Sequence, residues 1–388
     1  MKRLLIILAL VGGFACGLPF GNLAWVQAED LRVAEGQAEE LCVVSYNVEN
    51  LFHPKHDTVW KPNPDPSLKG REIFIEKDDW EWTPEGERRW SYGRYYRKVE
   101  NIARVLTNIG EWDGVDVVGL QEVENAMCVR RLCNTLRRGE YDFVHYESPD
   151  PRGIDVALIY KKSRIDTIAT RAIRVSASLN DGMSAAKPLN DELITRDILY
   201  VCAKIKAKSK GLKVNGDTIH FFVCHLPSQR GGKAESEWKR KAAKQVLQQA
   251  VDSVYGIDPE AKIVVMGDMN SEPEEDIRGM RNRMKELKNE RVKELKNERV
   301  KELKNERVKE LKNERGTHKY QGRWSCLDQF YTSAALDSIS EVKIYNAAWI
   351  QEPDKKYLDL KPKRTFNGYR YQKDGFSDHL PIVLKVLL

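Results

Sequence analysis

The sequence has few cysteines, seven in 388 residues, and none of them form a Cys-x-x-Cys pair that would indicate a zinc site. Cys42, Cys202 and Cys224 stand inside apolar runs, so we expect them to be small buried hydrophobic residues. Cys128 and Cys133 are five positions apart on an expected helix, which places them on different faces. A chain of this length can build a core without a disulfide framework.

The body of the chain also lacks net charge, although the whole sequence carries a formal charge of +6. The first 28 residues contain Lys2 and Arg3 but no acidic residue, which gives +2. Residues 284–315 contribute the other +4. A neutral body provides no overall electrostatic argument for a polyanionic partner, so the substrate must be inferred from individual residues.

Long apolar runs are missing beyond the start of the chain. A positively charged start precedes the run from Leu4 to Ala15, and Val26-Gln27-Ala28 fits a small-x-small cleavage site. The run is shorter than the ~20 residues of a membrane-spanning helix. We therefore expect residues 1–28 to be a cleaved signal peptide and the protein to be secreted or periplasmic. A lipid anchor through Cys16 is the alternative, although the residues before it match a lipobox poorly.

Short apolar runs enriched in Val, Ile, Phe and Tyr predict strands along the chain. They occupy residues 41–47, 115–122, 154–160, 198–205, 219–225, 262–270, 326–332 and 380–387. Helical periodicity occupies residues 95–109, 125–136 and 235–251. No linker-like break divides these elements, so we expect one α/β domain over residues 29–388.

Residues 284–315 are four copies of the octad Met/Val-Lys-Glu-Leu-Lys-Asn-Glu-Arg. Their apolar positions alternate at spacings of five and three, which leaves no lasting apolar stripe on a helix of 3.6 residues per turn. A coiled coil is therefore not expected. We interpret the repeat as an exposed, partly ordered helix inserted in a loop and ending near Gly316, because surface loops tolerate added length.

Residues 53–96 form a long segment that is rich in turn residues and aromatic side chains. Such a segment is either a packed surface excursion or a rim beside a functional site. The sequence leaves both interpretations open.

Polar residues gather where the expected strands end. Strand ends in α/β folds hold side chains rigidly at a cleft. Carboxylates, amides and imidazoles at such an edge suit Mg²⁺, which prefers oxygen ligands, and a phosphate. These residues are Asn47, Glu49, Glu122, His225, Asp268, Asn270, Asp378 and His379.

Taken singly, each of these elements has an ordinary structural explanation. Gly267-Asp-Met-Asn270 resembles a common Asx turn, and His225 resembles a core histidine. Glu122 is compatible with a charge at a helix N-terminus. The order in which all of them occur is what argues for a catalytic site.

That order resembles the endonuclease/exonuclease/phosphatase superfamily over the whole expected domain. Met269 is the one visible departure, an apolar residue where Phe or Leu is common. The matching segments are Ser45-Tyr-Asn-Val-Glu49, Leu120-Gln-Glu122, Ile154-Asp-Val-Ala-Leu-Ile159, His225-Leu-Pro-Ser228, Gly267-Asp-Met-Asn270, Leu327-Asp-Gln-Phe330 and Ser377-Asp-His379.

The resemblance implies a four-layer α/β sandwich, with two packed, mostly antiparallel mixed sheets flanked by helices. It implies a Mg²⁺-dependent phosphoesterase, with Mn²⁺ able to bind the same oxygens. A phosphodiesterase or endonuclease acting on nucleic acid is the first expectation. An inositol-phosphate phosphatase or a sphingomyelinase-like phospholipase C is the alternative. A non-catalytic interaction protein is a third, which the presence of every site residue argues against. We expect a monomer with no stable protein partner.

The resemblance also implies a role for each residue. Glu122 would be the chief Mg²⁺ ligand, with Asn47, Glu49 and Asp378 nearby, directly or through water. The deoxyribonuclease branch has a phosphate-contacting arginine that Arg196 resembles, and a structural salt bridge is the alternative for this residue.

The catalytic roles follow from the same resemblance. Asp268 would orient or activate the attacking water, and Asn270 would hold the phosphate. His225 and His379 would bind phosphoryl oxygens and assist proton transfer. Asp328 would orient His379, and Asp155 would do the same for His225.

Overall fold

The computed structural model describes residues 40–56, 58–62, 72–76, 79–175, 193–207, 217–273, 280–282, 316–336 and 339–387. The described residues belong to one compact unit, Glu39–Leu388. The expected signal peptide and the octad repeat lie outside the described residues and stay predictions. No helix in the described ranges is long and apolar enough to span a membrane.

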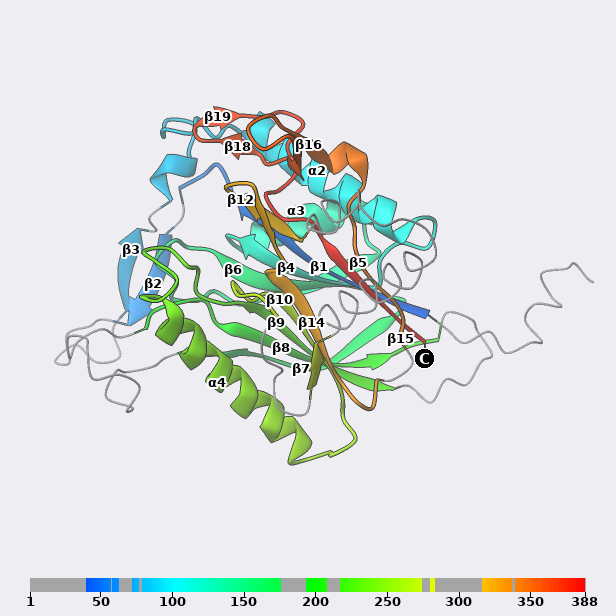
Figure 1. The fold of residues 1–388 in the computed structure, drawn as a ribbon. Helices are drawn as coiled ribbons and strands as arrows, with labels where there is room; N and C mark the ends of the chain where they lie inside the picture. Colours follow the sequence, from blue (N-terminus) through cyan, green and yellow to red (C-terminus); the bar gives the residue numbers. More distant parts are fainter. Residues whose placement is uncertain are drawn as a thin grey trace, which may run out of the picture. The chain divides into compact units, whose positions relative to one another are not determined.

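Two six-stranded sheets form the centre of the compact unit (Figure 1). In spatial order, the first contains β15 (Ile339–Ile344), β20 (Ile382–Leu387), β1 (Glu40–Leu51), β4 (Val117–Val123), β6 (Asp155–Lys161) and β5 (Tyr141–His145). The second contains β11 (Met280–Asn282), β14 (Asp328–Ser333), β10 (Lys262–Asp268), β9 (Thr218–His225), β8 (Ile198–Ile205) and β7 (Ile165–Ile173). The pairs β1–β4 and β9–β10 are parallel, and the other pairs within these sheets are antiparallel. The expected mixed sheets are confirmed.

In the part of the chain that the structure describes, three long helices cover the outer faces of the sheets (Figure 1). α2 (Tyr92–Gly110) and α3 (Ala126–Arg137) lie on the first sheet, and α4 (Glu237–Tyr255) lies on the second. The Asn125 side chain caps α3 by accepting hydrogen bonds from the backbone N–H groups of Met127 and Cys128. The three predicted helices are confirmed, with α4 starting and ending later than its periodicity indicated.

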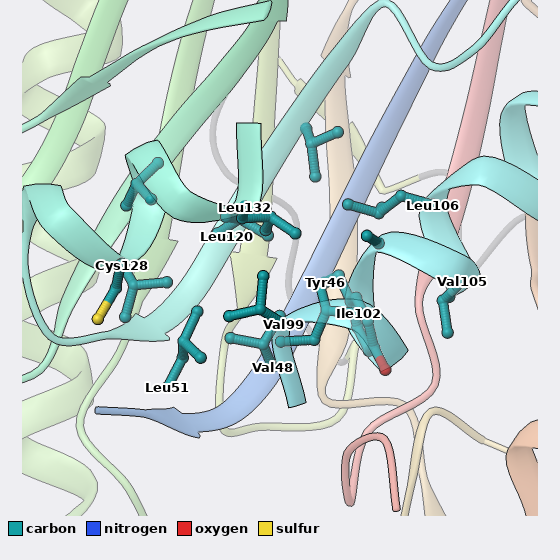
Figure 2. Close-up of a cluster of buried hydrophobic side chains, with 14 of the residues drawn as sticks. Tyr46, Val48, Leu51, Val99, Ile102, Val105, Leu106, Leu120, Cys128 and Leu132 are labelled. Carbon is teal, nitrogen blue, oxygen red and sulfur yellow. The ribbon is translucent and has the colours of Figure 1, made fainter. Parts of the chain in front are cut away.

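Alternating side chains of the central strands divide the core into separate layers. Val43 of β1 packs between the two sheets, whereas its neighbour Val44 faces the helices. Val264 of β10 likewise faces the first sheet, and Val265 packs under α4. Because strand side chains alternate between faces, one apolar run can line two cores. Figure 2 shows the layer between α2, α3 and the first sheet, and the four-layer sandwich is confirmed.

Four two-stranded hairpins and two 3-10 helices complete the described structure. The 3-10 helices are Trp80–Trp82 and Ala348–Ile350. The hairpins are β2 (Thr58–Pro62) with β3 (Glu72–Glu76), β12 (His318–Tyr320) with β13 (Arg323–Ser325), β16 (Gln351–Asp354) with β17 (Asp359–Pro362), and β18 (Phe366–Asn367) with β19 (Arg370–Tyr371).

Three aromatic side chains near the end of the 53–96 segment belong to the core, and others there are exposed. Trp82, Trp90 and Tyr95 are buried in the layer beneath α2. Trp82 stacks on Phe52 with the ring centroids 4.9 Å apart, and it meets Phe366 edge to face. The described part of this segment is therefore a packed excursion.

Candidate active site

The predicted site residues gather at one end of both sheets. Asn47 and Glu49 lie near the end of β1, and Glu122 lies near the end of the parallel neighbour β4. His225 and Asp268 are the last residues of β9 and β10, and they are register partners. Since parallel strands end at the same edge, each sheet delivers its polar side chains to one place.

One carboxylate oxygen connects the two sheets. Oδ2 of Asp268 accepts a hydrogen bond of 3.2 Å from Nδ2 of Asn47, which belongs to the other sheet. The same oxygen lies 3.6 Å from Nε2 of His225 and 3.8 Å from Nε2 of His379. Asp268 is only 2% exposed. An amide and two imidazoles from separate segments therefore converge on a single buried oxygen.

The backbone is left-handed at four non-glycine residues of this edge. Glu49 (φ 53°), Asn50 (φ 54°), Glu122 (φ 63°) and Asn270 (φ 48°) all adopt this sparsely populated conformation. The resulting turns aim backbone donors at side chains. The Asn50 N–H donates to Oε2 of Glu122 at 2.9 Å, and the Asn270 N–H donates to Oδ1 of Asp268 at 2.9 Å. The local strain is therefore tied to the positioning of both carboxylates.

The two histidines are held in opposite protonation states. Burial disfavours a charged His379, but Asp328, whose Oδ2 lies 2.7 Å from Nδ1 of the ring, and then Asp268 outweigh it and raise the pKa of His379 well above its usual value. Burial and then the charges of Arg196, Arg152 and His379 lower the pKa of His225 well below its usual value. At neutral pH the edge thus offers a cationic His379 and a neutral His225.

The comparisons with known proteins agree with this arrangement. The model of the endonuclease/exonuclease/phosphatase family matches residues 42–387. The chain belongs to the endonuclease/exonuclease/phosphatase family. It is therefore an enzyme that hydrolyses phosphate esters. A search of curated proteins found no match.

The chain is also similar, at low identity, to solved structures of several different proteins. Humanized TDP2 of D. rerio is 14% identical, with a TM-score of 0.49 over 89% of this chain and 98% of that one. The human Nocturnin catalytic domain is 16% identical, with a TM-score of 0.45 over 89% and 93%. The mannosyl-6-phosphatase Bt3783 of Bacteroides thetaiotaomicron is 13% identical, with a TM-score of 0.48 over 90% and 100%. Similarity at this level concerns the fold and does not transfer a substrate.

In this family member Asp155 does not orient His225, so that expectation is wrong. Oδ2 of Asp155 lies 3.2 Å from Nε2 of His145, and Oδ1 accepts hydrogen bonds from the backbone N–H and the hydroxyl of Ser148. Within the described ranges Nδ1 of His225 is buried without a hydrogen-bond partner. The physical reason is that Asp155 opens β6, where its carboxylate is engaged by His145 of the neighbouring strand β5 and by Ser148.

Arg196 forms the structural salt bridge that was the alternative to a phosphate contact. Its Nη1 donates to Asp150 at 2.8 Å, and its Nη2 and Nε donate to the carbonyl oxygens of Leu226 and His225 at 3.0 and 3.3 Å. The residue is 6% exposed. Arg196 therefore supports the backbone of His225 from behind the site.

Two half-exposed arginines border the site and were not found from the sequence. Arg364 bridges two predicted metal ligands, with Nε 3.1 Å from Glu49 and Nη2 2.8 Å from Asp378. On another side, Nη2 of Arg152 donates to Oδ1 of Asn50 at 2.8 Å and lies 3.6 Å from Glu122. Neither arginine ends an apolar run, so no sequence pattern marked them.

Lys98 of α2 is a third cation that the sequence analysis missed. It is buried, and its Nζ donates to the hydroxyl of Thr365 and to the carbonyl oxygen of Phe376. Burial lowers its pKa to about 8, against the opposing carboxylates of Glu49 and Asp378. A signal existed, because Lys98 stands four residues before Ile102 on the apolar face of the helix.

The carboxyl groups of this edge differ in how readily they ionise. Burial, reinforced by Asp378, raises the pKa of Glu49 to about 7. Burial also raises the pKa of Asp268 to about 6, although the charge of His379 opposes this. At Asp378, Arg364 and then His379 overcome burial and lower the pKa to about 2. Raised carboxyl pKa values show that further positive charge would stabilise the ionised site.

The four predicted Mg²⁺ ligands are not equally available. Both oxygens of Glu49 accept hydrogen bonds, from Nε of Arg364 at 3.1 Å and from the Thr365 N–H at 2.7 Å. Oδ1 of Asn47 accepts the Glu49 N–H at 3.0 Å. Glu122 accepts the Asn50 N–H through Oε2, and Asp378 accepts Nη2 of Arg364 through Oδ2, so each carboxylate has a second oxygen beyond that hydrogen bond. All four residues offer oxygen donors, so the set fits Mg²⁺ by its chemistry, with Glu122 and Asp378 as the most accessible ligands.

Proposed function

We propose that this phosphoesterase is a secreted, Mg²⁺-dependent phosphodiesterase acting on nucleic acid. The observation that carries the proposal is the convergence of Asn47, His225 and His379 on Oδ2 of Asp268. A buried carboxylate facing one neutral and one cationic imidazole is suited to proton transfer and charge stabilisation in the same step. These are the requirements of an in-line attack by water on phosphorus.

The proposed roles follow from the electrostatics of each group. Asp268, with a pKa raised to about 6, would accept a proton from the attacking water. His379, kept cationic by Asp328, would neutralise charge that develops on a phosphoryl oxygen. Asn270, fixed by a 2.9 Å hydrogen bond from Nδ2 to the Leu226 carbonyl, would position the phosphate together with neutral His225.

Glu122, Asn47 and Asp378 would hold Mg²⁺, directly or through water, and Mn²⁺ fits the same oxygens. The cation, when bound, would withdraw negative charge from the phosphate. Burial raises the pKa of Glu49 and of Asp268, and a cation bound at this edge would favour their ionised forms. We further propose that the enzyme acts as a monomer outside the cytoplasm, on the basis of the leader in residues 1–28.

Hydrolysis of bis-p-nitrophenyl phosphate and nicking of supercoiled DNA test the proposal, each with Mg²⁺ and with EDTA. Glu122→Gln keeps the shape of the side chain and removes its charge, and we expect it to lower kcat/KM at least ~100-fold. Asp166→Asn, at an exposed carboxylate paired with Lys206, is the matched control and should retain activity. Full activity in EDTA, or in Glu122→Gln, would refute the metal-dependent mechanism.

A phosphomonoesterase, such as an inositol-phosphate phosphatase, is the second candidate. The half-exposed guanidinium groups of Arg152 and Arg364 favour it, because a terminal phosphate carries more negative charge than a diester. A sphingomyelinase-like phospholipase C is the third arm of the same test. Inactivity on both diesters, with phosphate release from monoesters or head-group release from phospholipid vesicles, would replace the nuclease assignment.

A further inference from the structure

His318 is a histidine of the active-site edge to which neither the sequence motifs nor the proposed mechanism assigns a role. It begins β12, and its backbone forms an isolated antiparallel bridge with His379. The Leu380 N–H donates to the Thr317 carbonyl at 2.7 Å, which secures the same contact. The two imidazole centroids lie 4.7 Å apart with 37° between their planes. Two histidines that are distant in sequence are thus fixed side by side by main-chain contacts.

Asp378 completes a three-residue cluster with these rings. One potential ligand atom from each of His318, Asp378 and His379 lies within 4.8 Å of the other two. His318 and Asp378 are half-buried and His379 is buried, so the cluster is accessible from one side. This is the spacing that three protein ligands of one ion can adopt, with room for water or substrate as a further ligand.

The outer contacts of the cluster orient its donors. Nδ1 of His379 is engaged by Oδ2 of Asp328 at 2.7 Å, so Nε2 is the ring nitrogen that would bind the metal, which displaces its proton. Oδ2 of Asp378 accepts from Nη2 of Arg364 at 2.8 Å, which leaves the other carboxylate oxygen. A carboxylate on the distal nitrogen is the usual support of a metal-binding histidine, because it fixes the tautomer and the ring orientation.

We infer that His318, Asp378 and His379 form a binding site for a transition-metal dication such as Zn²⁺ or Co²⁺. Two imidazoles and one carboxylate are a donor set that borderline metals prefer, whereas Mg²⁺ prefers an all-oxygen shell. The proposed Mg²⁺ ligands Glu122 and Asn47 supply a carboxylate and an amide oxygen, although Nε2 of His225 lies 3.8 Å from Oε1 of Glu122. The site therefore selects a different metal from the one proposed for catalysis, and only Asp378 belongs to both sets.

A second cluster within the described ranges serves as an internal comparison. His145, Glu147 and Asp155 also place ligand atoms within 4.8 Å of one another, but they offer one imidazole, and Glu147 is exposed. Nε2 of His145 already lies 3.2 Å from Asp155. With a single nitrogen donor, this cluster should bind Zn²⁺ or Co²⁺ more weakly.

Metal binding without substrate tests the inference, independently of any catalytic assay. The chain, free of a histidine tag and in excess Mg²⁺, is titrated with Co²⁺ while visible absorption and heat are recorded. We expect one site whose affinity falls at least ~10-fold in His318→Gln and in Asp378→Asn. His145→Gln is the matched control and should retain the wild-type affinity. Equal affinity in wild type and His318→Gln, or loss of binding in His145→Gln, would overturn the inference.

A second measurement needs no variant and so does not depend on its folding. Zn²⁺ should protect His318 of the wild-type chain from diethyl pyrocarbonate, as read by peptide mass spectrometry, while His220 reacts at the same rate with and without the metal. His220 lies on β9 with Nδ1 2.9 Å from the Tyr200 hydroxyl, outside both clusters. Unprotected His318 at saturating Zn²⁺ would contradict the site.

Discussion

At the residue scale, a variant of Asp328 can show whether this residue acts on His379 through its charge or only through packing. Asp328→Asn keeps the volume of the side chain but removes the charge 2.7 Å from Nδ1 of His379. The pKa of His379 should fall, and kcat/KM at neutral pH should drop by about 10²-fold or more, because the ring no longer enters the reaction as a cation. Imidazole titration by NMR together with steady-state kinetics measures both effects.

The control for this variant is His145→Gln, which removes one partner of another buried histidine–carboxylate pair. That pair joins His145 to Asp155, and its loss should leave kcat/KM near the wild-type value. An Asp328→Asn enzyme with an unchanged histidine titration would contradict the electrostatic role of Asp328.

Glu49 provides a prediction about pH and stability. Because its folded pKa is raised from 4.5 to about 7, the folded chain binds this proton more tightly than the unfolded chain does. The contribution of protonated Glu49 to the free energy of unfolding is therefore complete below about pH 4.5, and it is lost as the pH rises through about 7. In EDTA, Glu49→Gln should therefore gain Tm relative to wild type between pH 5 and pH 8. A Tm difference between the variant and the wild type that stays constant over this range would show that the fold does not raise the pKa of Glu49.

Part of the site was predictable from single residues, and the reason is local. Asn47, Glu122 and Asp268 end apolar runs, so their place at a sheet edge follows from the chain nearby. Arg364 meets Glu49 across 315 residues of sequence, and only the tertiary fold creates that contact. The wrong pairing of Asp155 has the same origin, because the sequence of β6 does not reveal that its neighbour β5 brings His145 to Asp155.

At the scale of elements, the close pairing of β9 and β10 depends on Gly267. It has a φ of 143°, and a Cβ there would lie 1.9 Å from the carbonyl oxygen of Cys224. Gly267→Ala should therefore lower the free energy of unfolding by about 3 kcal/mol or more, since backbone must move beside Asp268. Denaturant unfolding of the metal-free chain measures the loss.

Gly139→Ala is the matched control for this change. Gly139 also has a positive φ, 85°, but no heavy atom lies within 4 Å of a Cβ built there. Gly139→Ala should lower the free energy of unfolding by only about 1–2 kcal/mol, because the only penalty is the left-handed backbone conformation. Equal losses in the two variants would mean that the steric clash at Gly267 is relieved without cost.

The elements that the sequence pattern revealed are those buried on both faces. The central strands β1, β4, β9 and β10 carry continuous apolar runs because each lines two layers of the core. The edge strands β7 and β15 were missed, since most of their described side chains are exposed or half-buried. An edge strand lacks the apolar pattern on which such a prediction depends.

At the scale of the whole molecule, the octad repeat is predicted to be dispensable. Residues 284–315 fall between β11 and β12, so a chain that joins residue 283 to Gly316 keeps every strand of both large sheets. We expect this deletion to change Tm by a few degrees at most and to leave kcat/KM near wild type, because loop length costs little free energy. A folded deletion variant without activity would show that the repeat contributes to catalysis.

The hydrogen bond between Asn47 and Asp268 joins the two sheets, so the active site forms only after both sheets have folded and packed together. Asn47 and Glu122 arrive with one sheet, and His225 and Asp268 arrive with the other. A folding intermediate with one completed sheet would show secondary structure by circular dichroism but would turn over no substrate. During refolding, the delay between the circular dichroism signal and the first product therefore measures how long the two sheets take to dock. Docking is a long-range event that a signal from either sheet alone would not report.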